Sequence, residues 1–138
     1  MKKRFATAKW LGSGKEGTGT LTSQSGAFSD AQYSYKSRFE EGTGTNPEEL
    51  MAAAHAGCFS MKLSFVLGEA GFTPDSIETK CTISLDNGVI SESHLEVKAN
   101  VPGLDAEKFK TLAEQAKDGC PVSKAYSMNI TLDANLQN

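Results

Sequence analysis

Histidine and cysteine are scarce in this chain of 138 residues, which has two histidines and three cysteines. An odd number of cysteines does not form the paired framework of a small secreted domain, and no two of them have the short spacing of a zinc finger. The side chains that could bind a metal are scattered along the chain: His55, Cys58, Cys81, His94 and Cys120. We therefore expect no metal site.

A surplus of positive charge and long apolar runs are also missing. The 17 acidic residues outnumber the 14 basic ones, and no Lys/Arg block gives the chain an electrostatic reason to bind nucleic acid. No stretch approaches the roughly 18 apolar residues of a membrane span, and the basic residues 1–4 are not followed by the apolar run of a secretory signal. We expect one domain over residues 1–138, in the reducing cytoplasm, with neither nucleic acid nor membrane as a partner.

The first forty residues predict short strands over residues 5–10, 19–23 and 32–39. The glycine pattern GSGKEG at residues 12–17 is similar to a nucleotide-binding loop. A phosphate site would need a helix to follow this loop, whereas the next residues predict a strand. We therefore interpret residues 12–17 as a hairpin loop.

The stretch NPEELMAAAHAGCFSM at residues 46–61 predicts the start of a long helix. Asn46 can cap it, Pro47 suits its first position, and Glu49 stands where a capping box requires a carboxylate. Glu49 thus has a structural role, which leaves Glu48 free for another. The helix should run to about residue 69, and its apolar sides place it in the interior.

The rest of the chain predicts a β-hairpin, an amphipathic helix and a final strand. Residues 77–85 and 89–101 alternate as strands around the sequence DNG, which is typical of a type I′ turn. Asp105 caps the amphipathic helix, and Cys120 and Pro121 lie where that helix ends and a short new one can begin. With a last strand over residues 128–136, these elements predict an α+β fold.

The three thiols have different surroundings. Cys81 alternates with Ile83 on the inner face of its strand, which is typical of an inert buried thiol. Cys120 lies at a helix junction, where exposed N–H groups and the helix dipole favour a thiolate. Cys58 lies within the apolar helix beside Gly57, and a glycine there indicates that something approaches the helix closely.

Two interpretations of Cys58 compete with a redox role. His55 precedes it by three residues, so both lie on one helical face, as in a thiol hydrolase or acyl transferase whose base is the histidine. A core histidine without a catalytic role is the simpler interpretation of His55. The other alternative is a non-catalytic dimeric binding module with unreactive thiols.

The sequence resembles the OsmC/Ohr peroxidases (osmotically inducible protein C and organic hydroperoxide resistance protein) over nearly the whole chain. The motifs are RFEEGTGTNPEELMAAAHAGCFSM at 38–61, LGEAGFTP at 67–74 and DGCPVSKA at 118–125. The histidine in AAHAGC and the RFE segment are more similar to the OsmC branch. The resemblance implies an OsmC/Ohr-like fold, with antiparallel sheets packed around a long central helix in an intertwined homodimer whose active sites lie at the subunit interface.

The resemblance also implies a Cys-based thiol peroxidase that reduces organic hydroperoxides, and hydrogen peroxide less well. By position, Cys58 is the peroxidatic cysteine and Cys120 the resolving one, while Arg38 and Glu48 form the ion pair that supports the thiolate. A dithiol of the lipoamide type, such as a lipoyl protein, re-reduces the disulfide, and no flavin, haem or metal is required. The chemistry agrees, because a sulfenic acid needs a second thiol to trap it before irreversible oxidation.

The spacing of Glu48 and Cys58 adds an inference of its own. They are ten residues apart, which on a straight helix is a rise of about 15 Å. Glu48 is then too far away to organise an arginine beside its own Cys58. Either the helix breaks between them, or Glu48 serves the thiol of a partner chain, and we hypothesise the second.

One side of the helix carries an apolar stripe of Ala54, Cys58, Met61 and Phe65. Core packing is the ordinary explanation of such a stripe. If part of the stripe lines the substrate pocket instead, with His55, Phe59 and Met61, alkyl and aryl hydroperoxides would be favoured over hydrogen peroxide, because they bury apolar surface.

Overall fold

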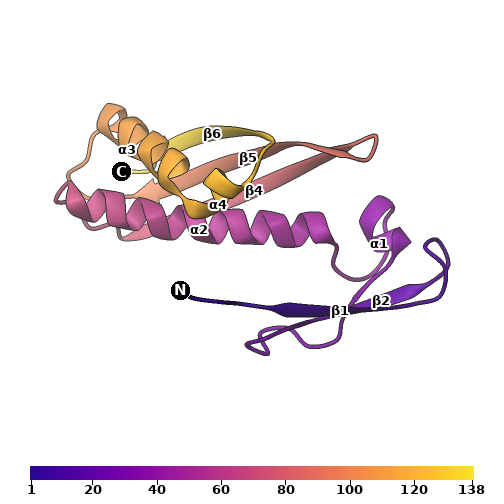
Figure 1. Ribbon diagram of the computed structural model, residues 1–138. Coiled ribbons are helices and arrows are strands. Elements are labelled where there is room, and N and C mark those ends of the chain that lie inside the picture. Colours follow the sequence, from indigo (N-terminus) through magenta and orange to yellow (C-terminus); the bar gives the residue numbers. More distant parts are fainter. The chain divides into compact units, whose positions relative to one another are not determined.

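Two units, Met1–Leu50 and Met51–Asn138, make up the chain in the computed structural model, which describes all residues from 1 to 138. Figure 1 follows the chain through both units by colour, from the N-terminal strands to the C-terminal strand. The single domain over residues 1–138 stays a prediction.

A three-stranded antiparallel sheet forms most of the first unit. Its strands are β1 (Ala6–Leu11), β2 (Thr18–Ser23) and β3 (Ala31–Tyr33), and they pair in that order. The glycine-rich residues 12–17 connect β1 to β2, which confirms the hairpin loop. Gly19 in β2 lies under two aromatic rings, since a Cβ there would come within 2.4 Å of the Tyr33 ring and 2.6 Å of the Trp10 ring.

The third predicted strand, over residues 32–39, is wrong in its second half, which forms the short helix α1 (Tyr35–Phe39). Ser34 caps this helix, because its hydroxyl accepts a hydrogen bond from the Ser37 backbone N–H at 3.2 Å. The Ser37 hydroxyl in turn accepts the Ser34 backbone N–H at 2.8 Å. This serine pair is a capping box without the usual glutamate, and alternation of apolar residues does not reveal it.

Helix α2 (Pro47–Glu69) confirms the predicted long helix and its cap. The Asn46 side chain accepts the Glu49 backbone N–H at 2.7 Å. The Glu49 carboxylate accepts a hydrogen bond from the Thr45 hydroxyl at 2.6 Å, rather than from the backbone of the cap residue. The helix is continuous over its 23 residues.

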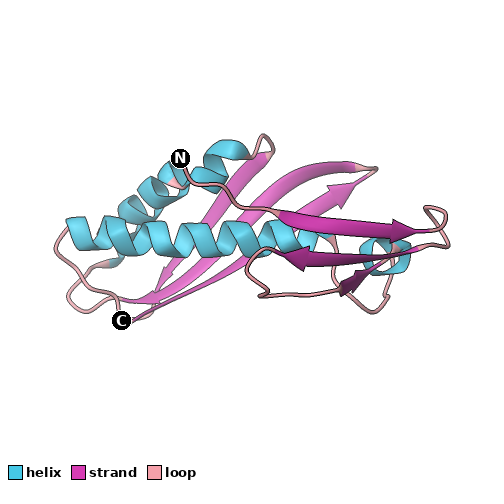
Figure 2. Cartoon of the chain, turned by 60° about the horizontal axis from the view of Figure 1, so that its bottom comes forward, coloured by secondary structure: helices cyan, strands magenta, loops and turns pink.

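A second three-stranded sheet lies in the unit Met51–Asn138, with β4 (Ser76–Asp86), β5 (Val89–Asn100) and β6 (Asn129–Leu136) in that order. β4 and β5 form the predicted hairpin, and the positive φ angles of Asn87 (50°) and Gly88 (77°) fit its type I′ turn. β6 runs parallel to β5, so the sheet is mixed rather than antiparallel throughout. The reason is the crossover through α3 (Ala106–Gly119) and α4 (Pro121–Ala125), drawn in Figure 2 as the helical path between β5 and β6.

The hydrophobic core of this unit lies between the mixed sheet and the helices α2 and α3. Alternate residues of β5 face the helices, as the sequence pattern predicts, and the opposite face carries polar side chains. The fully or almost fully buried apolar residues are Phe59, Leu63, Leu67, Leu95, Val97, Ala99, Val101, Leu104, Phe109, Leu112, Ala113 and Ala116.

By length and composition alone, α2 could cross a membrane. A window of 18 residues in it has a mean hydropathy of 1.4, and 28% of that window is buried within this chain. The expectation that no stretch approaches such a length is therefore wrong by this measure. The core helix of a soluble protein can have the same length and hydropathy. In α2, Phe59, Leu63 and Leu67 are packed in the core.

Candidate active site

The thiols of Cys58 and Cys120 are in contact, with their sulfur atoms 2.7 Å apart. Cys58 comes from the middle of α2 and is half-buried, whereas Cys120 is fully buried at the junction of α3 and α4. Both cysteines are free thiols. Because a disulfide bond is about 2.05 Å long, a small movement is enough to join them.

The junction residue Cys120 is fixed by the two helices that it separates. Its backbone N–H donates to the Ala116 carbonyl at 3.0 Å and ends α3, and its own carbonyl accepts the Lys124 N–H at 3.1 Å in α4. Pro121 follows at the first position of α4, as predicted. Gly119 leaves room for Lys62, whose Cε would lie 3.0 Å from a Cβ at that position.

The surroundings of Cys58 act on its ionisation in opposite directions. Burial is the largest influence and raises the pKa of Cys58, and the hydrogen bond that it shares with the Cys120 thiol raises it further. The backbone N–H of Val122 and the ammonium group of Lys62 lower the pKa of Cys58, but they do not outweigh burial. Lys62 lies one turn from Cys58 on α2, and sequence reasoning missed it although its i, i+4 spacing was visible.

Arg38 and Glu48 form the predicted ion pair, in the unit Met1–Leu50. The guanidinium of Arg38 donates from Nη2 to Glu48 Oε1 at 2.8 Å, and from Nε to both carboxylate oxygens at 3.1 and 3.3 Å. Glu48 is buried, whereas the Arg38 side chain is 40% exposed. The carboxylate thus holds the guanidinium in one plane, and Nη1 is left to donate to another group.

His55 is completely buried and is held at both ring nitrogens. Nδ1 lies 2.6 Å from the Ser93 hydroxyl on β5, and Nε2 lies 2.8 Å from the Ser123 hydroxyl on α4. Burial lowers the pKa of His55, so the ring stays neutral near pH 7. The histidine therefore has no free nitrogen to serve as a base for Cys58.

The three residues predicted for a substrate pocket lie in different environments. Phe59 is fully buried in the core, His55 is enclosed between two serines, and the Met61 side chain is 66% exposed on the outer face of α2. They do not line one cavity within this chain. Around Gly57 the space is open, because a Cβ there would meet nothing within 4 Å.

The third cysteine is half-buried on β4, as its strand pattern indicates. The Cys81 sulfur lies 3.2 Å from the Ser93 hydroxyl and 4.0 Å from Nδ1 of His55. Burial raises the pKa of Cys81 more than the serine lowers it. This thiol therefore belongs to the polar group around His55.

One cluster could hold a metal ion by its donor types. His94, Glu96 and Asp133 offer ligand atoms within 4.8 Å of one another, on the polar face of β5 and β6. His94 Nε2 already pairs with the Asp133 carboxylate at 3.3 Å. Exposed groups of this kind are common without an ion, and none of the cysteines belongs to the cluster.

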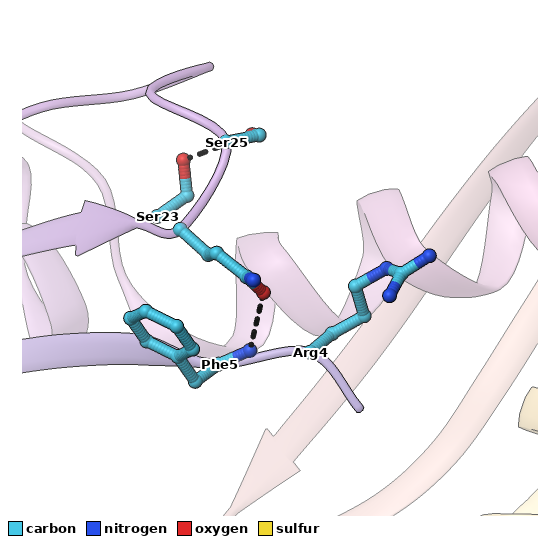
Figure 3. Close-up of a pocket in the computed structure, with 5 residues that line it drawn as sticks. Arg4, Phe5, Ser23 and Ser25 are labelled. Carbon is cyan, nitrogen blue, oxygen red and sulfur yellow. Dashed lines mark hydrogen bonds between the residues drawn. The ribbon is translucent and has the colours of Figure 1, made fainter. Parts of the chain in front are cut away.

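Besides a cavity between β2, β3 and Thr43, two further cavities lie in the unit Met1–Leu50. One has a volume of about 500 Å³, and Figure 3 shows its lining, with the Phe5 backbone N–H donating to the Gln24 side chain and with Arg4 alongside. It contains no thiol and none of the predicted site residues. The other, of about 250 Å³, is lined largely by aromatic rings around the guanidinium: Trp10, Gly14, Tyr33, Ser34, Tyr35, Arg38 and Phe39.

Two thiols in contact, one half-exposed and one buried, on an α+β chain with a long central helix, define a dithiol site. The chain belongs to the OsmC family, whose sequence pattern, described as OsmC-like protein, matches residues 40–135. Peroxiredoxin OsmC of Escherichia coli (strain K12) is 47% identical over 135 residues, which cover 95% of this chain and 94% of that protein. The resemblance inferred from the motifs is thus confirmed.

Relatives of the Ohr branch match as well. Organic hydroperoxide resistance protein OhrB of Bacillus subtilis (strain 168) is 32% identical over 124 residues, 86% of this chain and 89% of that protein. The crystal structure of the B. subtilis OhrB gives a TM-score of 0.65 at 30% identity and covers 96% of this chain and 98% of that one. An OsmC-like protein from Mycoplasma pneumoniae, with a TM-score of 0.77, 16% identity and 99% of both chains covered, shares the fold.

We predict that Lys62→Met raises the pKa of Cys58 further, because it removes an ammonium group that favours the thiolate. Only part of the Cys58 thiol is ionised near pH 8, so alkylation of Cys58 by iodoacetamide, followed by peptide mass spectrometry, should slow about threefold. Lys110→Met removes the same charge from an exposed position on α3 and should leave the rate unchanged. Equal rates in the two variants would show that Lys62 does not act on the thiol.

Proposed function

We propose that this chain is a Cys-based thiol peroxidase that reduces organic hydroperoxides, and hydrogen peroxide less well. The observation that carries the proposal is the contact between the half-exposed sulfur of Cys58 and the buried sulfur of Cys120. The relatives named peroxiredoxin OsmC and organic hydroperoxide resistance protein support it.

The reaction proceeds in two steps at these sulfurs. The Cys58 thiolate attacks one peroxide oxygen, the O–O bond breaks, and the alkoxide takes a proton and leaves as an alcohol. Cys58 is then a sulfenic acid. The Cys120 sulfur attacks it, the S–S bond forms, and the S–O bond breaks, so that hydroxide leaves with the Cys120 proton as water. A dithiol reductant, such as a lipoyl protein, then returns both thiols by exchange.

To form a thiolate, Cys58 needs a cation that lowers its pKa by more than burial raises it. Within one chain the pKa of Cys58 is raised, despite Lys62. The Arg38–Glu48 pair offers a fixed guanidinium with Nη1 left to donate, which suits both a thiolate and a peroxide oxygen. We infer that Arg38 and Glu48 are catalytic together with Cys58 and Cys120.

The position of Glu48 near the start of α2 supports a homodimer in which each chain serves the other. α2 is unbroken from Pro47 to Glu69, so the rise of about 15 Å between Glu48 and Cys58 persists. The alternative of a broken helix is thereby removed. The guanidinium that faces Cys58 then comes from a second copy of the chain.

The outer face of α2 also suits a second copy. Met61 and Phe65 are 66% and 62% exposed, and Gly57 beside Cys58 offers open space to an approaching surface. Exposed apolar residues on a helix of mean hydropathy 1.4 are stabilised when another protein surface covers them. The homodimer therefore accounts for the apolar helix without a membrane.

The aromatic cavity beside Arg38 supports an apolar peroxide as the substrate. Rings of Trp10, Tyr33, Tyr35 and Phe39 surround a volume of about 250 Å³ next to the guanidinium. An alkyl or aryl group can bury its surface there while the peroxide faces the cation. This cavity takes the role that sequence analysis gave to His55, Phe59 and Met61.

A cytoplasmic location is part of the proposal, and the chemistry of the thiols supports it. All three cysteines are free, and the peroxidase cycle needs a reducing compartment to return its disulfide to the dithiol. No step of the cycle calls for nucleic acid or a membrane.

The alternative of a thiol hydrolase is disfavoured by the contacts of His55. Both its ring nitrogens are engaged by serine hydroxyls, so Cys58 has no histidine base. A binding module with unreactive thiols is disfavoured by the sulfur contact, because two thiols that serve only as apolar packing do not require their sulfurs to touch.

We predict that Cys58→Ser abolishes peroxide consumption with a dithiol reductant. Cys120→Ser should consume about one peroxide per chain and then stop, because the sulfenic acid forms but is not trapped. Peroxide loss measured by a ferrous-iron colour assay checks both variants, with Cys81→Ser as the control that keeps full activity. Turnover by Cys58→Ser would refute the peroxidase mechanism.

We further predict that two inactive variants restore activity when they are mixed. In a dimer of an Arg38→Met chain with a Cys58→Ser chain, the intact arginine faces the intact thiol. After unfolding and refolding together, an equimolar mixture should regain about a quarter of the wild-type rate, since half of the dimers are mixed and each has one working site. A mixture without activity would mean that the arginine serves the thiol of its own chain.

The aromatic cavity predicts a substrate-dependent effect of Tyr35→Ala. Because the variant loses apolar surface beside Arg38, kcat/KM for cumene hydroperoxide should fall about tenfold, whereas that for hydrogen peroxide should change little. Phe5→Ala, in the cavity of Figure 3, is the control. An equal loss with both peroxides would exclude this cavity as the substrate pocket.

A further inference from the structure

A buried hydrogen-bonded bridge links the sheet to the helix that follows the resolving cysteine. His55 on α2 stands in its middle, with Ser93 of β5 at one ring nitrogen and Ser123 of α4 at the other, at 2.6 and 2.8 Å. A neutral imidazole donates at one nitrogen and accepts at the other, and serine hydroxyls can supply either partner. The bridge is therefore satisfied at every atom without a charge.

The bridge runs beside the two thiols. On α2, His55 and Cys58 are three residues apart, and Ser123 follows Cys120 by the same number along α4. The His55–Ser123 contact and the Cys58–Cys120 contact thus join the same two segments, one helical turn apart. Because the His55–Ser123 contact holds the two segments together, it limits how far apart the Cys58 and Cys120 sulfurs can lie.

α4 depends on such outside contacts for its position. It has five residues and no side-chain cap at its start, so it has little stability of its own. Besides the histidine bridge, Tyr126 at its end donates its hydroxyl to the Met51 carbonyl at 2.9 Å and meets the His55 ring edge-on, with ring centroids 5.2 Å apart. His55 thus contacts both Ser123 within α4 and Tyr126 at the end of α4.

We propose that His55 is a positioning residue for disulfide formation, which acts through Ser123 to hold the Cys120 sulfur against Cys58. The inference rests on the proposed function for its place in the cycle, but it concerns only the second step. In that step the Cys120 sulfur attacks the Cys58 sulfenic acid, the S–S bond forms, and the S–O bond breaks with loss of water. The histidine takes no part in the first step, because both its nitrogens are engaged by serine hydroxyls.

The test compares Ser123→Ala and His55→Leu with Ser60→Ala in the full-length protein. Ser60 also lies on α2 and bonds the Thr79 hydroxyl at 2.7 Å, so its loss costs a similar contact without touching α4. The equilibrium constant for forming the 58–120 disulfide, measured against a glutathione redox buffer, should fall about tenfold in Ser123→Ala and His55→Leu and stay unchanged in Ser60→Ala. Thermal unfolding by circular dichroism verifies that each variant is folded.

Rapid-mixing measurements with cumene hydroperoxide then separate the two steps. In Ser123→Ala the oxidation of Cys58 should keep its rate, whereas disulfide formation should slow about tenfold and sulfinic acid should accumulate with excess peroxide. Unchanged disulfide formation, or an equal loss in both steps, would overturn the proposal. If the parent protein consumed no peroxide while the glutathione equilibrium still shifted as stated, the peroxidase function would fail and the positioning role would stand.

Discussion

Two sulfur atoms 2.7 Å apart, from residues separated by 62 positions, are the contact around which this chain is organised. Cys58 comes from a helix whose other face is packed in the core, so its thiol has a fixed direction. Cys120 reaches it because the chain leaves β5, crosses over through α3 and α4, and returns as the parallel strand β6. The crossover that makes β6 parallel, against the expected antiparallel pattern, is thus the segment that brings the second thiol to the first.

The electrostatics of this contact are the reason why we propose a second chain at the site. Burial and the neighbouring thiol raise the pKa of Cys58, and Lys62 and the Val122 N–H offset only part of this effect. The proposed peroxidase therefore needs a further cation beside Cys58, and the Arg38 guanidinium held by Glu48 is suited to this role. Its buried carboxylate fixes a guanidinium that remains partly exposed. In the homodimer that we propose, the Arg38 guanidinium of one chain faces the Cys58 sulfur of the other.

The sequence was most informative where local chemistry decides the structure. The Asn46 cap, the DNG turn, the Asp105 cap and the glycine loop at residues 12–17 are all present as predicted, because each depends on a few neighbouring residues. The sequence was less informative for two elements. The helix at Tyr35–Phe39 depends on a serine pair, and the parallel direction of β6 depends on long-range packing.

The candidate site follows the same division. The family resemblance implied the cysteine pair and the Arg38–Glu48 pair, and the members of each pair are in contact in the structure. His55 was left between a base and a core residue, since its two serine partners lie 38 and 68 positions away and no local signal marks them. Lys62 had the helical spacing of a neighbour of Cys58. Its closeness to Gly119, on a distant segment, has no signal in the local sequence.

The central claim is that these two sulfurs meet to trap the product of peroxide cleavage. Its most direct test is the intact mass of the wild-type chain after one equivalent of an organic hydroperoxide, without reductant. The account predicts a loss of two hydrogens, about 2 Da, from a disulfide that peptide mapping assigns to Cys58 and Cys120. An unchanged mass, or a stable gain of oxygen at Cys58 with Cys120 still free, would contradict it.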